Sequence, residues 1–142
     1  SFGDGFGINE TVQVVAYSDT DRGQTHAFIT GPDGVGMTDL GTLGGDYSIA
    51  YGINDAGQVV GESTTANGQT HAFITGPNGV GMTDLNSVVN PPTGLTFFSA
   101  NAINNNGQLA AVGTVVPEPE MYAMLLLGLG LIGFLARGRA TA

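Results

Sequence analysis

The residues best suited to chemistry in this chain are its two histidines, His26 and His71, which stand at equivalent places of a repeated segment. Imidazole can bind a metal ion or act as a general base. A zinc site normally needs three or four protein ligands, and no third ligand stands at a useful spacing. Because each histidine recurs with the repeat, we interpret both as structural residues that form hydrogen bonds at turns.

Carboxylate and hydroxyl side chains are the next candidates for catalytic residues. Asp39 and Asp84 also recur with the repeat, so we expect strand-end caps rather than an acid/base pair. Ser48, Ser63 and Ser99 lack the G-x-S-x-G context of a nucleophilic serine. We therefore predict no catalytic residue and no enzyme activity.

Turns that contain Asp or Asn before glycine could hold calcium through oxygen ligands, with Asn54, Asp55, Asn104 and Asn105 as the candidates. Turn formation alone explains these residue types, and nothing matches the twelve-residue EF-hand loop. The chain has no cysteine, which excludes a thiolate metal site. We expect no cofactor and no metal that the fold requires.

The charge balance excludes nucleic acid as a partner. Twelve acidic residues face three basic ones, Arg22, Arg137 and Arg139, and there is no lysine. A protein that binds nucleic acid needs cations to neutralise phosphates. The chain opens at Ser1 without a visible export signal, so we expect further sequence upstream.

An internal repeat dominates the sequence before the tail. Residues 24–40 recur at 69–85 with one change, Asp33 to Asn78, and a second element begins at Gly7, Gly52 and Ala102. Four short strands in about 45 residues is the period of a propeller blade. We predict an all-β body at 1–115, built of repeated four-stranded antiparallel units that form an incomplete, propeller-like arrangement. The expected repeats are about 7–51, 52–96 and a partial 97–115, with strands near 12–18, 25–30, 36–41, 47–53, 58–64, 70–75, 81–85, 97–103 and 108–116.

The segment 116–142 has a different character. Residues 121–136 carry no charge and span roughly 24 Å as a helix, against a hydrocarbon core of about 30 Å. Pro117 and Pro119 keep the approach extended, and Arg137 with Arg139 should stay on the cytoplasmic side. We predict a single, marginal transmembrane helix with these apolar residues: Met121, Leu125, Leu126, Leu127, Leu129, Leu131, Ile132, Phe134, Leu135 and Ala136.

The tail resembles the PEP-CTERM sorting signal of Gram-negative bacteria. Val116-Pro117-Glu118-Pro119 matches its motif, while the apolar stretch and Arg137/Arg139 match its other two parts. The resemblance implies recognition and cleavage by an exosortase, a membrane-embedded processing enzyme. It also implies a transient stay in the inner membrane, a final place at the cell surface or in the extracellular matrix, and association with exopolysaccharide and biofilm.

The body resembles the HAF family of extracellular repeats. The resemblance rests on His26-Ala27-Phe28 and its copy at 71–73, on the Gly-rich run 39–45 and on the segment 53–61. It implies an exported, propeller-like body and no known activity. The second copy departs from the pattern at Asn86-Ser87, where the Gly-rich run is missing.

We interpret the chain as an exported, non-enzymatic repeat protein with a binding or matrix role and a C-terminal sorting signal. One alternative is a fragment of a secreted propeller enzyme whose active site lies in upstream blades. Another is a surface protein that stays anchored in the membrane.

Overall fold

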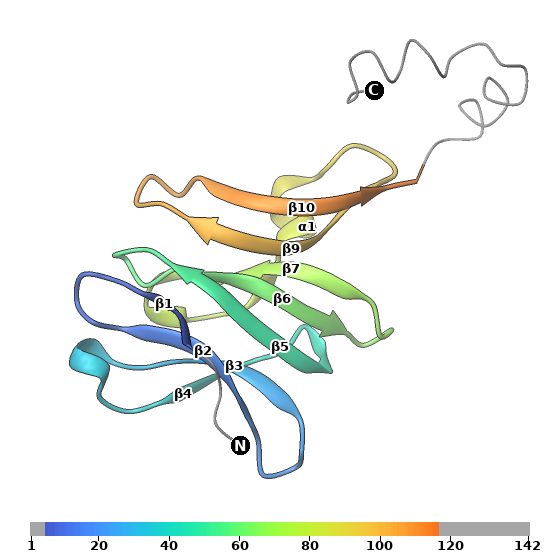
Figure 1. Ribbon diagram of the computed structural model, residues 1–142. Coiled ribbons are helices and arrows are strands. Elements are labelled where there is room, and N and C mark those ends of the chain that lie inside the picture. The colour runs from blue at the N-terminus through green and yellow to red at the C-terminus, as the bar shows by residue number, and fades with distance from the viewer. Residues whose placement is uncertain (1–4, 117–142) are drawn as a thin grey trace, which may run out of the picture. The chain divides into compact units, whose positions relative to one another are not determined.

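Short strands, mostly paired antiparallel, are the main regular structure of the described residues. The computed structural model describes residues 5–116 (Figure 1). Two 3₁₀ turns, η1 (Pro32–Gly34) and η2 (Pro77–Gly79), and one short helix, α1 (Leu85–Val89), interrupt the strands. The strands are β1 (Gly5–Ile8), β2 (Val14–Asp19), β3 (Thr25–Ile29), β4 (Thr38–Gly41), β5 (Gly44–Ile53), β6 (Val59–Thr65), β7 (Thr70–Ile74), β8 (Thr83–Asp84), β9 (Leu95–Ile103) and β10 (Leu109–Val115).

The two copies of the repeat form the same hairpin with the same register. In the first copy, β2 pairs with β3 from Val15–Ile29 to Asp19–Thr25. In the second, β6 pairs with β7 from Val60–Ile74 to Thr64–Thr70. The predicted antiparallel pairing is therefore confirmed in both copies. We refer below to three structural repeats: the first is β1–β4, the second is β5–β8, and the third is the hairpin β9–β10.

The predicted fold class is nevertheless wrong. Strands β1–β8 belong to one eight-stranded sheet in the order β1-β2-β3-β5-β6-β7-β8, with β4 paired to β3. A parallel bridge between Thr25 and Tyr47 joins the first repeat to the second. Strands β9 and β10 form a separate two-stranded sheet. Within residues 5–116, the repeats are thus not separate four-stranded units in a propeller, because a long-range strand pairing connects two of them.

The transmembrane helix of the predicted fold class is not among the elements of residues 5–116. No helix in the described part of the chain is long and apolar enough to cross a membrane. The segment 121–136, for which we predicted that helix, lies outside the residues that the structure describes.

The helix α1 appears where the second copy departs from the repeat. Asp84 caps its N-terminus by accepting a hydrogen bond from the Asn86 amide, and Leu85 is buried. In the first copy the chain instead continues through Gly41, whose φ of 78° suits glycine. Asn90, in a left-handed conformation, ends the helix before Pro91. A short sequence change therefore replaces extended chain with one helical turn.

The core consists of two apolar layers on either side of the second repeat. Successive residues of a strand point to opposite faces, so Val59 and Val60 enter different layers. The first layer contains Val15, Ala27, Ile29, Ala50, Val59 and Phe73. The second layer contains Val60, Ala72, Leu85 and Ala100.

Of the described residues, 5–91 and 96–114 form one compact unit, and both core layers belong to it. Residues 92–95 and 115–116 belong to another unit, in which the Val116 amide donates to the Gly94 carbonyl at 2.7 Å.

Candidate functional site

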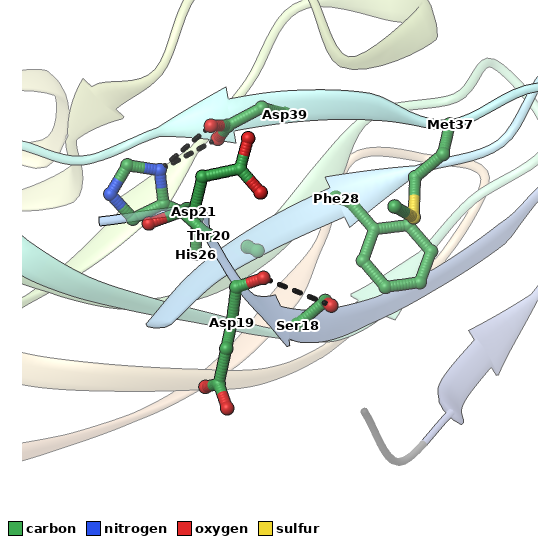
Figure 2. Close-up of a pocket in the computed structure, with 9 residues that line it drawn as sticks. Ser18, Asp19, Thr20, Asp21, His26, Phe28, Met37 and Asp39 are labelled. Atoms are coloured by element: carbon green, nitrogen blue, oxygen red, sulfur yellow. Dashed lines mark hydrogen bonds and ion pairs between the residues drawn. The ribbon is translucent and has the colours of Figure 1, made fainter. Parts of the chain in front are cut away.

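Each histidine forms a hydrogen bond with the aspartate thirteen positions further along the chain. His26 Nδ1, on β3, lies 2.8 Å from Asp39 Oδ2, on β4 (Figure 2). His71 Nδ1, on β7, lies 2.6 Å from Asp84 Oδ2, on β8. The two pairs occupy equivalent positions and each connects two neighbouring strands. We predicted roles for these four residues separately and did not predict their pairing, although their common offset was the signal for it.

The same aspartates also close the turn that follows each strand. Asp39 Oδ1 accepts the amide of Gly41 at 2.7 Å. Asp84 Oδ1 accepts the amide of Asn86 at 2.9 Å. Each carboxylate thus holds a histidine with one side and a backbone amide with the other. This geometry confirms the prediction that the aspartates cap strand ends.

An open pocket of about 300 Å³ lies beside the first pair (Figure 2). In a catalytic triad, a carboxylate orients the imidazole through one ring nitrogen, and a nucleophile forms a hydrogen bond with the other ring nitrogen. His26 Nε2 is buried and has no hydrogen-bond partner among the described residues. Ser18, in the same pocket, donates to the Asp19 carbonyl instead. Nor does any group of three His, Asp or Glu residues within 5–116 form a metal site.

The electrostatic state of Asp84 follows from its surroundings. Burial raises the pKa of this carboxyl, but hydrogen bonds from His71 and Asn86 outweigh it, and the net pKa lies below the ordinary 3.8. A carboxyl whose pKa is lower in the folded state stabilises the fold while it is ionised. That contribution is lost as the pH falls through the lowered pKa.

We expect the free energy of unfolding to fall as the pH drops below 3.8, and Asp84→Asn to make that fall shallower. Asparagine keeps one acceptor oxygen for the Asn86 amide but loses the charge and the second oxygen that His71 contacts, which costs about 1.5–3 kcal/mol at neutral pH. Urea unfolding at a series of pH values measures both effects. Asp33→Asn is the matched control, since the second copy already has Asn78 there. Equal acid sensitivity of the parent and Asp84→Asn would contradict this account.

The serines have structural partners. Ser48 Oγ accepts the Ala27 amide at 2.8 Å and donates to the Gly41 carbonyl. Ser63 Oγ accepts the Leu43 amide at 2.8 Å. Ser99 donates to Asn101. These hydroxyls connect neighbouring segments of backbone and side chain.

A contact between Tyr47 and Glu62 was not predicted from the sequence. The Tyr47 hydroxyl donates to Glu62 Oε1 at 2.7 Å. Burial, followed by the hydrogen bond and charge of Glu62, raises the pKa of Tyr47 far above its ordinary value. Burial and Glu62 also raise the pKa of Tyr51. A lone glutamate within an otherwise uncharged strand was the available signal for this contact.

The turn residues considered for calcium connect one structural repeat to the next. Asn9 Nδ2 donates to the Asn54 carbonyl at 3.0 Å, and Asn54 Nδ2 donates to the Asn104 carbonyl at 3.1 Å. Asp55 Oδ1 accepts the Glu10 amide, and Asn105 Oδ1 accepts the Asp55 amide. We call this series the asparagine ladder. It uses the turn oxygens as hydrogen-bond acceptors between repeats.

The predicted sorting residues fall almost entirely beyond this region. Val116 is the last residue that the structure describes. Pro117, Glu118, Pro119, Arg137 and Arg139 lie outside the described residues, as do all the apolar residues predicted to span the membrane.

A comparison with known proteins identifies a motif in the C-terminal segment, most of which lies outside the described residues. A family model for the PEP-CTERM protein-sorting motif matches residues 115–140. The chain carries a PEP-CTERM sorting motif. This motif implies an exosortase-targeted, exported protein that is processed at a membrane on its way to the cell surface. No curated protein and no solved structure matches the chain, and no comparison supports the HAF resemblance of the body.

Proposed function

We propose that this chain is a non-enzymatic, exported surface or matrix protein that an exosortase cleaves at its C-terminal sorting motif. The match of residues 115–140 to the PEP-CTERM motif carries the proposal. The acidic Pro-Glu-Pro segment is the recognition element, and the β body is the part that remains after processing.

The contacts of the body support a structural or binding role rather than catalysis. His26 and His71 bind aspartates at equivalent positions, and these aspartates also cap turns. The same arrangement occurs in both copies, which favours a structural role, because an enzyme needs only one active site. Ser48 and Ser63 use their hydroxyls on neighbouring backbone groups.

An exopolysaccharide of the matrix is our proposed environment for the mature protein. Arg22 is the one Lys or Arg among residues 5–116, so an anionic polysaccharide would be repelled by the acidic body. A neutral polysaccharide therefore suits the charge of this protein better.

Replacing Pro117, Glu118 and Pro119 together by alanine tests the sorting proposal. In a host that has an exosortase, we expect the parent protein to lose both tail arginines, because cleavage at the motif precedes them. The triple variant should stay uncut and remain with the inner membrane. Mass spectrometry of the C-terminal peptide, together with membrane fractionation, measures both results.

The matched control replaces Pro91 and Pro92 by alanine, which removes two prolines outside the motif. This control should be processed like the parent. If the triple variant is also processed and exported normally, the sorting proposal fails. A parent protein that keeps residues 137–139 at the cell surface would indicate permanent anchoring instead.

A further inference from the structure

The β body binds the first residues of the sorting motif through one short turn. The family model matches from residue 115, so Val115 and Val116 belong both to the motif and to the described body. The Val116 amide donates to the Gly94 carbonyl at 2.7 Å. Residues 92–95 and 115–116 fall in the same compact unit. The motif thus begins at residues that the body still holds.

The turn that binds Val116 depends on a glycine. The Leu95 amide donates to the Pro92 carbonyl at 3.0 Å, which closes a β-turn with Gly94 at its third position. Gly94 has a φ of 87°, a conformation that favours glycine. A Cβ at Gly94 would lie 2.5 Å from the Val116 carbonyl oxygen. A larger residue at position 94 would therefore strain the turn and displace Val116. We call Pro92–Leu95 the exit turn.

The two strands equivalent to β10 end in a different way. The chain after β2 and at the end of β6 enters a hairpin, where the Thr20 amide donates to the Gln24 carbonyl and the Thr65 amide to the Gln69 carbonyl. After β10 the chain instead passes into the sorting motif. The exit turn, which comes between α1 and β9 in the chain, provides the acceptor there. It is therefore specific to the place where the motif leaves the body.

The attachment of Val116 to the exit turn is weak. Pro92 and Thr93 are exposed, and Val115 and Val116 are 64% and 63% exposed. Little apolar surface is buried where β10 ends, so the hydrogen bond provides most of the attachment. The net free energy of one such bond favours the closed state over the open state by about two- to tenfold.

The amide of Val116 is of use to an enzyme that binds this segment. A protein that takes up an extended peptide as an added strand forms hydrogen bonds with the N–H and C=O groups of the peptide backbone. Pro117 and Pro119 have no N–H, so Val116 is one of three amide donors in residues 116–120. While Gly94 accepts the Val116 amide, the enzyme has only the other two.

We propose that the exit turn is an autoinhibitory contact, and that the exosortase acts on the state in which Val116 has separated from Gly94. The inference rests on the proposed function and deepens it by naming the part of the body that regulates cleavage. Gly94 is a positioning residue, because it acts through Val116. The contact slows cleavage without preventing it, since one hydrogen bond closes it.

Gly94→Ala in the full-length chain tests the proposal in a host that has an exosortase. A pulse-chase experiment measures the half-time for conversion of the precursor into the processed protein. We expect Gly94→Ala to be processed about two- to tenfold faster than the parent. The matched control is Gly107→Ala, because Gly107 has a φ of 77° and, among the described residues, nothing lies within 4 Å of an added Cβ. This control has similar backbone strain without a contact to Val116, so it should be processed at the parental rate.

Two further measurements separate the release of Val116 from a general loss of stability. Phe28→Ala removes a half-buried ring from β3 and leaves the exit turn unchanged, so its processing rate should equal that of the parent. Hydrogen exchange of the Val116 amide, followed by NMR on the full-length precursor in detergent micelles, reports the contact directly. We expect this amide to exchange about two- to tenfold faster in Gly94→Ala and at the parental rate in Gly107→Ala.

The processing rates decide the question. An unchanged rate for Gly94→Ala overturns the proposal, and so does a slower rate, which would mean that the exit turn presents the motif to the enzyme. Equal acceleration by Gly107→Ala or Phe28→Ala also overturns it and assigns the effect to stability. Unchanged exchange of the Val116 amide in Gly94→Ala overturns the account of the contact. In each of these outcomes the parent is still cleaved, whereas the sorting proposal itself fails only through the triple variant of Pro117, Glu118 and Pro119.

Discussion

Phe73→Ala is expected to lower the free energy of unfolding by about 3–5 kcal/mol, the usual cost of removing a buried phenylalanine. The ring is fully buried in the layer between the first and second repeats, where Val15, Val59 and Ala27 belong to the same cluster. Alanine leaves a cavity that the surrounding strands can fill only in part. Urea unfolding followed by circular dichroism measures the loss.

Phe28→Ala is the matched control, because Phe28 has the equivalent position on the outer face of the first repeat. It is half-buried, so the same change should cost clearly less in dilute solution. The difference measures the contribution of one covering repeat. Equal losses for the two variants would show that the layer described here does not form.

Gly61→Ala is expected to destabilise the second repeat by about 1–3 kcal/mol or more, because the added methyl group has no space. A Cβ at this position would overlap the Ile49 carbonyl oxygen and approach the Ala50 Cα to 2.9 Å. Both atoms belong to the backbone of β5, which pairs with β6 at this point. Only a movement of the strands can therefore remove this overlap, because a side-chain rotation does not move backbone atoms.

The first repeat again provides the control, since Ala16 is the counterpart of Gly61. Ala16 is buried with its Cβ accommodated, so Ala16→Gly should cost only about 0.5–1 kcal/mol through chain entropy. Thermal unfolding of both variants compares the two sites. A Gly61→Ala protein as stable as the parent would mean that β5 and β6 do not pair as described.

Local patterns predicted the strands and hairpins well. The strands predicted near 12–18, 25–30, 58–64 and 70–75 lie within about two residues of the observed bounds of β2, β3, β6 and β7. The helix α1 was missed because its five residues are too few for a helical period. Its cap at Asp84 and its end before Pro91 were the available signals, and we interpreted Asp84 as a strand-end cap.

Those local patterns could not predict how the strands are arranged in the sheet. The bridge between Thr25 and Tyr47 joins residues far apart in the sequence, and no turn or alternation specifies it. Assigning a blade to each repeat assumed that each copy pairs only with itself. The contact of Tyr47 with Glu62 escaped prediction for the same reason, since it depends on the register of β5 and β6.

By itself, the sequence determined the sorting motif, the repeat and the likeness of the two hairpins, because each depends on residues that are contiguous or separated by a fixed interval. Only the tertiary structure decided that His26 binds Asp39, that Phe73 is buried while Phe28 is half-buried, and that the turn asparagines form a ladder. The burial and the hydrogen bonds of a residue depend on which segment packs against its face of the strand. Identical residues in identical hairpins therefore acquire different roles once the repeats stack.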